Sequence, residues 1–379
     1  MENNFRKIAE NLLKPAGIGL DGKNPWDIKI INPNFYSRVL LHGSLGLGEA
    51  YMEAWWECKK LDEFFYRLLK ARVSENIMVS WPVIVSFLKA KFLNLQSVGR
   101  AFQVGERHYD LDNELFEMLL GKTMAYSCGY WRKAKTLDSA QNAKFDLICK
   151  KLGLKKGPAS SAGRQKILDI GCGWGGFAKY AAENYKVKVV GVTVSKEQAS
   201  FAKELCKGLL VEIKVMDYRD LNEQFDHIVS VGMFEHVGPK NYKLFMEVAK
   251  RCLKENGLFL LHTIGSIKSE NNSDPWLNKY IFPNGTLPSL RQISQAVENL
   301  FLVEDVHNFG PDYEKTLIEW HKNFEKSWVK LKGKYDDKFY RMWNYYLLSC
   351  VGAFRARRIQ LWQIVLSLGG VPGGYKSVR

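Results

Sequence analysis

The pattern of apolar and polar residues in the middle of the chain predicts a layered α/β structure. Five short apolar runs predict buried strands, and they begin at Gln165, Lys186, Val211, Phe225 and Leu258. Amphipathic stretches that predict helices lie between them, and the last of these helices is expected to end at Gly257. This alternation of strand and helix indicates a doubly wound, mostly parallel sheet.

Helical patterns dominate on both sides of this region. Residues 1–120 are expected to form a smaller, mainly helical N-terminal domain, and residues 121–379 a larger domain that carries the sheet. Residues 313–367 are patterned as aromatic helices, whereas residues 266–312 are rich in Asn, Ser and Pro and are expected to cover the mouth of a site. The glycine-rich end, residues 369–379, is expected to be mobile.

Two segments fit neither pattern. Residues 77–92 are apolar but are interrupted by Ser80 and Pro82, so the stretch is too short to span a membrane. It can form a buried helix or lie on a membrane surface, and the sequence leaves both open. Residues 157–164 are small and polar, which predicts a loop inserted just before the first strand of the sheet.

The charge of the chain is strongly positive and unevenly distributed. The net charge is +15, which fits an anionic partner such as nucleic acid or a membrane surface, although a basic enzyme without such a partner also fits. Residues 1–120 contain 15 Lys and Arg against 15 Asp and Glu, so the whole excess lies in residues 121–379, with 40 against 25. The seven cysteines are odd in number and lack metal-ligand spacing, which predicts reduced thiols, a cytoplasmic protein and no metal site.

A glycine-rich loop follows the first strand of the predicted sheet. Ligands of such sheets bind beyond the carboxyl ends of the strands, where glycines let the backbone approach them closely. Gly171, Gly173 and Gly176 alone would also fit a dinucleotide fingerprint. The whole run from Ile167 through Asp169 to Gly176 instead resembles the first motif of class I S-adenosylmethionine-dependent methyltransferases, and this interpretation is favoured.

The next two strands end in further polar residues. Many folds of this class place an acidic residue after the second strand for ribose hydroxyls, but this chain does not. Thr193, Ser195 and Gln198 are therefore the predicted hydrogen-bonding residues. After the third strand, where an adenine ring is expected, the candidates are Asp217, Tyr218 and Arg219. An ion pair of Arg219 with Asp217 or Asp220 is the alternative explanation for that arginine.

The order of several long motifs points to one family. They are YSCGYW (126–131), LDIGCGWGG (168–176), GVTVSKEQ (191–198), DYRDL (217–221), VSVGMFEHVGPKNY (229–242), LLHTIGS (260–266), DPWLNKYIFPNG (274–285) and GAFRARRIQLWQ (352–363). Together with SLGLGEAYMEAWWE (44–57), they resemble the two-domain cyclopropane-fatty-acyl-phospholipid synthases over nearly the whole chain.

The resemblance implies a reaction on lipids. S-adenosylmethionine would methylate a cis double bond of an unsaturated phospholipid in a bilayer, and deprotonation of the resulting carbocation would close a cyclopropane ring. An alkene is a weak nucleophile, so this chemistry needs precise positioning, exclusion of water and a base. The resemblance further implies a homodimer in peripheral contact with the inner face of the membrane, with residues 1–120 serving lipid docking and dimerisation.

The resemblance also implies the residues of the site. The base would be a bound bicarbonate ion, and Tyr126 and Ser127 would join the cofactor site. The implied ligands of bicarbonate are Cys128, Glu235, His262 and Tyr313, together with the backbone of Ile264. Taken alone, each has a simpler explanation: Cys128 as a buried thiol, His262 as a loop cap, and Glu235 as a partner of His236.

The last candidate is Cys350, which lies in an aromatic helical stretch. The expected mechanism needs no thiol nucleophile, so packing near the acyl pocket is favoured over covalent catalysis. Other functions weighed are an alkene methyltransferase that gives a methyl-branched product, a small-molecule methyltransferase, and an inactive lipid-binding protein. A nucleic-acid methyltransferase is disfavoured, because the sequence contains neither a nucleic-acid-binding module nor a base-methylation motif.

Overall fold

The computed structural model of this chain describes residues 2–73, 113–157, 164–271 and 273–379. The predictions for residues 77–92 and for the inserted loop, of which 158–163 are not described, lie outside these ranges. The chain forms two compact units, each built from separate stretches of sequence. We call them the helical unit (1–93, 271–283 and 313–359) and the sheet unit (94–270, 284–312 and 360–379).

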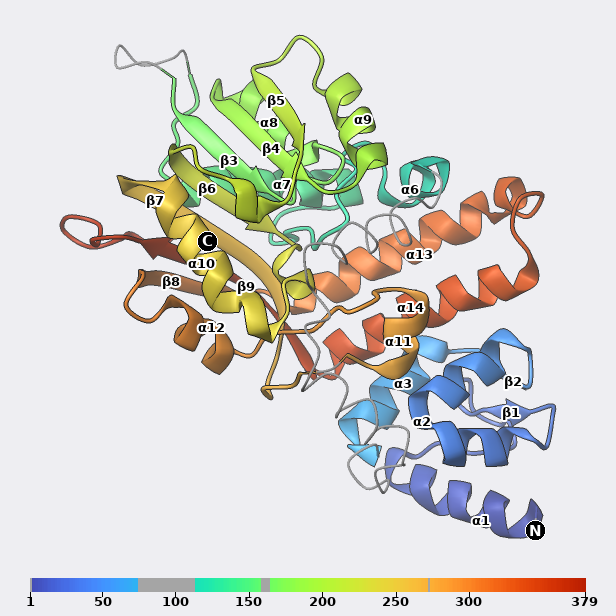
Figure 1. Ribbon diagram of the computed structural model, residues 1–379. Coiled ribbons are helices and arrows are strands. Elements are labelled where there is room, and N and C mark those ends of the chain that lie inside the picture. The colour runs from blue at the N-terminus through green and yellow to red at the C-terminus, as the bar shows by residue number, and fades with distance from the viewer. Residues whose placement is uncertain (1, 74–112, 158–163, 272) are drawn as a thin grey trace. The chain divides into compact units, whose positions relative to one another are not determined.

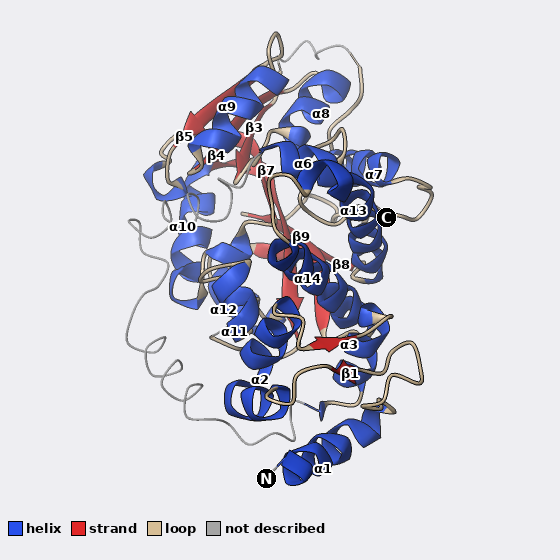
Figure 2. Cartoon of the chain, turned by 90° about the vertical axis from the view of Figure 1, so that its right-hand side faces the viewer, coloured by secondary structure: helices blue, strands red, loops and turns tan. Residues whose placement is uncertain are grey.

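A seven-stranded sheet is the centre of the sheet unit (Figures 1 and 2). Its strands, in spatial order, are β5 (Val211–Val215), β4 (Lys188–Thr193), β3 (Lys166–Ile170), β6 (Phe225–Val231), β7 (Leu253–Ser266), β9 (Ile359–Ser367) and β8 (Leu302–Asn308). Strands β3 to β7 pair in parallel, whereas β8 and β9 pair antiparallel. The predicted α/β fold with a mostly parallel sheet is therefore confirmed.

Both faces of this sheet are covered, because neighbouring residues of one strand point to opposite sides. Leu168 and Ile170 enter a core cluster with residues of α10 (Tyr242–Cys252) and α12 (Leu290–Val297). Ile167, which directly precedes Leu168 in the strand, packs with residues of α7 (Leu137–Lys151) and α8 (Gly176–Tyr185) instead. Among the described residues, this unit also contains helices α6 (Asn113–Leu120) and α9 (Lys196–Leu205).

The structure corrects three details of the predicted elements. Helix α10 ends at Cys252 rather than Gly257, because Leu253 is already extended and pairs with Phe225. Residues 359–367 form strand β9, which pairs with a strand that was not predicted, β8. The C-terminal segment is not loose, since Arg379 donates to both carboxylate oxygens of Asp305 at 2.5 and 2.7 Å.

The helical unit is held together by aromatic side chains. The helices described in it are α1 (Glu2–Leu13), α2 (Phe35–Met52), α3 (Leu61–Lys70), α11 (Pro275–Tyr280), most of α13 (Pro311–Leu331) and α14 (Asp337–Arg355), and a small sheet is formed by β1 (Lys29–Ile30) and β2 (Trp56–Glu57). Tyr345 of α14 lies against three rings, those of Tyr51, Phe65 and Trp276. Gly352 permits close packing of α14 on α3, because a Cβ there would lie 2.5 Å from the Cβ of Phe65.

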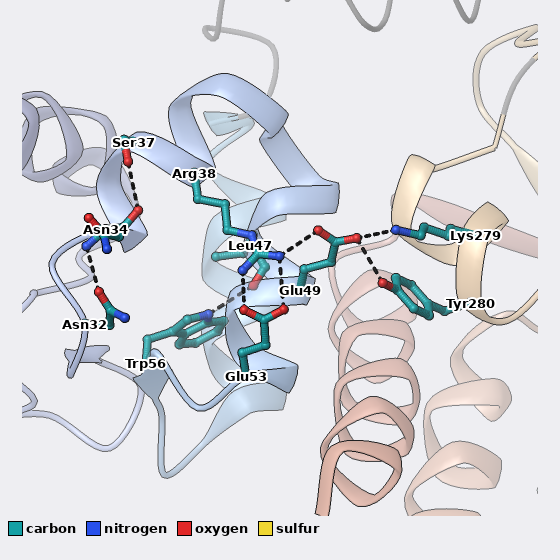
Figure 3. Close-up of polar contacts among 10 residues, drawn as sticks. All are labelled: Asn32, Asn34, Ser37, Arg38, Leu47, Glu49, Glu53, Trp56, Lys279 and Tyr280. Carbon is teal, nitrogen blue, oxygen red and sulfur yellow. Dashed lines mark hydrogen bonds and ion pairs between the residues drawn. The ribbon is translucent and has the colours of Figure 1, made fainter.

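These contacts explain how the observed units differ from a division at residue 120. Segments distant in sequence, which carry Trp276 and Tyr345, share one aromatic core with the N-terminal helices. Polar contacts add to it (Figure 3): Glu49 of α2 accepts from Lys279 and Tyr280 of α11, and its second oxygen accepts from Arg38. The roles predicted for residues 1–120, lipid docking and dimerisation, stay predictions.

Candidate active site

The candidate residues of the sheet unit gather at one edge of the sheet. Because β3, β4, β5, β6 and β7 are parallel, their carboxyl ends meet at the same edge. Asp169 lies near the end of β3, Thr193 ends β4, and Asp217 follows β5. Glu235 follows β6, and His262 pairs with the last residue of that strand, Val231. The structure therefore brings candidates from five strands to one edge.

The glycine loop between β3 and α8 has the backbone that its sequence predicts. Gly171, Gly173 and Gly175 have φ values of 83°, 53° and 83°, which favour glycine strongly. A Cβ at Gly176 would lie 2.1 Å from the carbonyl oxygen of Thr123, so a side chain there is excluded. A Cβ at Gly173 would meet no atom of the described residues within 4 Å, so this glycine borders open space in the described part of the chain.

Helix α7 fixes the segment that contains Tyr126, Ser127 and Cys128. Gln141 donates from its side-chain amide to the carbonyl oxygens of Ala125 and Ser127, at 3.3 and 2.7 Å. Lys144 donates from Nζ to Oγ of Ser127 at 2.6 Å. Since Gln141 and Lys144 are both fully buried, these bonds form in a site shielded from water.

Lys144 also balances a buried carboxylate of the site. Burial raises the pKa of Asp169 to about 7, and the positive charge of Lys144 opposes this rise. Burial lowers the pKa of Lys144 to about 7, opposed by Cys128 and by Asp169. Each of the two buried charges thus favours the charged form of the other. Lys144 therefore supports both Asp169 of β3 and the segment of residues 126–128.

The residues after β4 and β5 are bonded mainly to one another. Ser195 caps α9 by accepting from the backbone N–H of Gln198 at 3.2 Å, and Thr193 Oγ1 lies 3.1 Å from Oε1 of Gln198. Arg219 donates from Nε and Nη2 to the two carboxylate oxygens of Asp217, each at 2.7 Å. The alternative ion pair of Arg219 with Asp217 is therefore present.

Tyr218 is buried beside Arg219, and its ring lies 5.1 Å from that of Phe245. Together with the pair of Asp217 and Arg219, it forms a fixed polar and aromatic rim after β5. A role of these three residues and of Thr193, Ser195 and Gln198 in binding a cofactor stays a prediction.

Glu235 is a buried carboxylate with one oxygen bonded. Its Oε1 accepts from the backbone N–H of Ile264 at 2.6 Å, while its Oε2 has no hydrogen-bond partner among the described residues. Burial raises the pKa of Glu235 to about 7, and the backbone N–H of Ile264, the backbone N–H of Glu235 itself and the hydroxyl of Thr263 oppose the rise. Ile264 thus orients Glu235 through its N–H. To bind an anion as well, this N–H would have to be shared.

His262 likewise has one ring nitrogen in a hydrogen bond and one without a partner among the described residues. Its Nδ1 lies 3.3 Å from Nε2 of Gln363 on β9, whereas its Nε2 has no partner among the described residues. Burial lowers the pKa of His262 well below its ordinary value, and the charges of Lys144, Lys151 and His307 lower it further. The ring is therefore neutral at physiological pH, with one nitrogen bonded and the other open to a ligand.

Three other candidates have different surroundings. Cys128 is fully buried, and its Sγ lies 3.1 Å from the carbonyl oxygen of Gly129. Tyr313 belongs to the helical unit, where its ring lies near those of Trp320 and Phe354. Cys350 is also in the helical unit, and burial raises the pKa of its thiol to about 12, which disfavours a thiolate. The roles of Tyr313 and Cys128 as ligands stay predictions.

Sequence reasoning missed Lys144, Gln141 and Gln363. A signal for the first two exists, because both lie on the face of α7 that otherwise carries buried residues such as Phe145 and Ile148. Gln363 likewise interrupts the apolar run of β9. A polar residue at a position where the pattern demands an apolar one indicates a buried bond, but not the identity of its partner.

Comparison with known proteins assigns this chain to a family. A family model described as mycolic acid cyclopropane synthetase matches residues 96–364. The cyclopropane-fatty-acyl-phospholipid synthase of Escherichia coli (strain K12) is 53% identical over 378 residues, which cover 100% of this chain and 97% of that protein.

Solved structures are similar as well. The cyclopropane synthase MmaA2 from Mycobacterium tuberculosis matches with a TM-score of 0.64 and 29% identity, over 70% of this chain and 97% of its own. The mycolic acid cyclopropane synthase CmaA1, solved as a complex with SAH and CTAB, matches over the same shares with a TM-score of 0.63 and 32% identity. This chain therefore belongs to the cyclopropane-fatty-acyl-phospholipid synthase family of S-adenosylmethionine-dependent methyltransferases.

Proposed function

We propose that this enzyme transfers a methylene group from S-adenosylmethionine to the cis double bond of an unsaturated phospholipid, forming a cyclopropane ring. The observation that carries the proposal is a pair of buried polar atoms, Glu235 Oε2 and His262 Nε2, that lack partners among the described residues. Glu235 follows strand β6 and His262 lies in the neighbouring strand β7, opposite the last residue of β6, at the edge where the glycine loop lies. Buried polar atoms are rarely left unbonded, so they indicate a polar ligand.

The residues present fit S-adenosylmethionine at the glycine loop. The open space at Gly173, beside the amino-terminal end of α8, allows a ligand to approach the backbone closely. When bound, S-adenosylmethionine supplies the methyl carbon of the reaction. In this proposal Tyr126, Ser127, Asp169 and Asp217 hold it, and Lys144 fixes the position of Ser127 through the bond at 2.6 Å.

A bicarbonate ion fits the two unpartnered atoms. A neutral His262 can donate to an anion from its open nitrogen, and Glu235 can accept the O–H of bicarbonate. A full negative charge on Glu235 would repel the anion, but burial raises the pKa of Glu235 to about 7, which weakens this repulsion. Bicarbonate supplies a proton acceptor for ring closure. Cys128 and Ile264, which lie in the same unit as Glu235 and His262, are proposed as its further ligands, and the role of Tyr313 stays a prediction from the resemblance.

The first test is an assay with purified enzyme, S-adenosylmethionine, bicarbonate and vesicles of a cis-unsaturated phospholipid, followed by mass spectrometry of the fatty acids. Gain of one CH₂ with loss of the alkene is the expected result. A methyl-branched product would favour the alternative that the reaction stops before ring closure. No lipid product, despite measured binding of S-adenosylmethionine, would refute the proposal.

The second test is Glu235→Gln, which keeps the shape and the acceptor for Ile264 N–H but changes the group offered to bicarbonate. We expect loss of ring formation while binding of S-adenosylmethionine is unchanged. Glu212→Gln is the matched control, because Glu212 is an exposed glutamate of strand β5. Full activity of Glu235→Gln would refute the assigned role.

We also infer that the enzyme contacts the membrane peripherally, at its inner face, and acts as a homodimer. The substrate resides in a bilayer, and the excess positive charge of residues 121–379 supports attraction to anionic lipids. None of the helices that the structure describes is long and apolar enough to cross a membrane. The dimer rests on family resemblance, and a monomer by light scattering would contradict it.

A further inference from the structure

The tautomer of His262 decides whether its open nitrogen can serve an anion. A neutral imidazole carries its proton on one nitrogen, which donates, while the other can only accept. An N–H at Nε2 can bond an anion, whereas a bare Nε2 would repel it with its lone pair. The group that contacts Nδ1 therefore determines what His262 offers at the site.

Gln363 is that group. It is fully buried in β9, where it pairs with His307 of β8, and its Nε2 lies 3.3 Å from Nδ1 of His262. With the amide in this orientation its nitrogen can only donate, so Nδ1 accepts and the proton of His262 lies on Nε2. The amide oxygen of Gln363 has no partner among the described residues, so this contact is the bond that its side chain makes.

We propose that Gln363 is a positioning residue that holds His262 as the Nε2–H tautomer and thereby presents an N–H donor to the anion at the active site. The presence of an anion in this inference rests on the proposed function. The tautomer of His262 is independent of that function, because it is inferred from the contact with Gln363. The opposite orientation of the amide would reverse the tautomer, and the two orientations are distinguishable by experiment.

The surroundings of His262 make its tautomer matter. The positively charged or titratable groups that act on it are Lys144 and Lys151 of α7 and His307 of β8, and all three disfavour a second proton on the ring. The ring of Phe309 lies 5.7 Å away and adds no charge. Because His262 stays neutral, it cannot become a donor at both nitrogens, and Gln363 must select the one that faces the ligand.

The direct test is nitrogen NMR of the full-length enzyme with labelled histidine, in which His262→Asn assigns the His262 signals. We expect a protonated Nε2 and a bare, hydrogen-bonded Nδ1 in the wild type. A protonated Nδ1 would overturn the proposal. This measurement needs no activity, so it decides the tautomer even if the enzyme forms no cyclopropane.

The functional test is Gln363→Met, which keeps the length of the side chain but removes the donor. Assayed in buffer depleted of carbon dioxide and then titrated with bicarbonate, this variant is expected to lose about tenfold in kcat, as partners that orient a functional histidine commonly do. We also expect more bicarbonate to be needed for half-maximal rate, with the KM for S-adenosylmethionine unchanged. An unchanged kcat and bicarbonate response would overturn the positioning role.

The matched control is Gln360→Met on the same strand. Gln360 is also buried, but its Oε1 accepts from Asn308, so its loss should leave the bicarbonate response intact. If Gln363→Met does not fold, Gln363→Glu replaces it with a side chain of the same shape. When ionised, its carboxylate can only accept, so the proton of His262 should move from Nε2 in the wild type to Nδ1 in this variant, and the same tautomer in both proteins would contradict the proposal.

Discussion

Lys144 and Lys151 are two fully buried lysines of one helix that serve different parts of the sheet unit. Lys144 bonds Ser127, whereas Nζ of Lys151 lies 3.1 Å from Nδ1 of His307 and 3.6 Å from Asp305. Both have pKa values lowered by burial, to about 7 and about 8. Substituting each of them in turn therefore separates an effect on cofactor binding from an effect on the free energy of unfolding.

We expect Lys144→Met to raise the KM for S-adenosylmethionine about tenfold, because loss of one charge-assisted hydrogen bond is worth roughly 1.4 kcal/mol or more. Lys151→Met should leave this KM unchanged and lower the free energy of unfolding instead, because it removes a charge that faces Asp305. Steady-state kinetics and urea unfolding of both variants measure the two effects. Equal rises in KM would contradict the assignment of Lys144 to the cofactor site.

The carboxyl group of Glu235 should make stability depend on pH. Its pKa is about 7 in the folded chain, against an ordinary value of 4.5. Between these values the folded chain keeps a proton that the unfolded chain has released, so the free energy of unfolding falls as pH rises. Below pH 4.5 Glu235 is protonated in both the folded and the unfolded chain. Above pH 7 it is ionised in both, and the decrease in the free energy of unfolding is complete.

Glu235→Gln removes this titration and should be more stable than the wild type above pH 7, by about 3 kcal/mol from the size of the shift. The advantage should shrink towards pH 5. Urea midpoints of both proteins across this range measure it, and other titrating groups cancel because both proteins share them. A difference that does not vary with pH would show that Glu235 titrates near its ordinary value.

Gly173 offers a test of the glycine loop at the level of one Cβ. Its φ of 53° disfavours any side chain, yet a Cβ would meet no atom of the described protein within 4 Å. Gly173→Ala should therefore cost about 1 kcal/mol of stability from its backbone, but abolish measurable binding of S-adenosylmethionine in calorimetry. Gly208→Ala is the control, because Gly208 has a φ of 78° and equally open surroundings after α9. Equal binding by both variants would contradict the assignment of the loop.

At the scale of elements, the junction of α2 and α11 depends on one carboxylate (Figure 3). Burial of Glu49 acts to raise its pKa, but hydrogen bonds from Lys279, Arg38 and Tyr280 prevail and lower it to about 2. The folded chain thus holds Glu49 ionised, which stabilises the helical unit above pH 4.5 and is lost as pH falls towards 2.

Glu49→Gln should lower the free energy of unfolding by about 1–3 kcal/mol at pH 7, since it removes the charge from a partly buried network. The difference from the wild type should narrow below pH 4.5, as the wild-type carboxylate gains its proton. Thermal unfolding followed by circular dichroism measures both. Glu10→Gln is an exposed control, because Glu10 lies at the surface, where it pairs with Arg6. An effect of Glu49→Gln that is as small as this control would contradict the argument.

The elements that sequence patterns predicted are those with an intrinsic signature. The parallel strands carry runs of apolar residues, because both of their faces are covered. Strand β8 escaped prediction because Leu302, Val303 and Val306 are exposed while polar residues lie between them. Strand β9 resembles a buried helix in its composition, and its state is decided by pairing with β8, which no local pattern encodes.

The same limit applies to the site. Motifs predicted the glycine loop, Glu235 and His262, because each of these motifs is long and the motifs follow one another in a specific order. The supporting contacts were not predicted: Lys144 meets Ser127 across 17 positions of sequence, and Gln363 meets His262 across 101. Such partners are brought together only by the packing of α7 and β9, so they require the structure.

At the scale of the whole molecule, the net charge is divided unevenly along the chain. Residues 121–379 carry the entire net charge of +15, and residues 1–120 are neutral. Attraction to an anionic surface acts over a Debye length of about 10 Å at 0.1 M salt. If membrane binding is electrostatic, residues 121–379 must supply it. Any binding that persists at high salt must come from apolar contacts.

We therefore expect the full-length enzyme to float with anionic vesicles at low salt and to bind them at least tenfold more weakly at 0.5 M salt, where screening shortens the reach of each charge. Neutral vesicles of the same unsaturated chains should bind weakly, and their binding should not depend on salt. Ring formation in the vesicle assay should follow the bound fraction. Strong binding to neutral vesicles that persists at high salt would instead assign membrane contact to apolar side chains, and the positive charge would then serve another purpose.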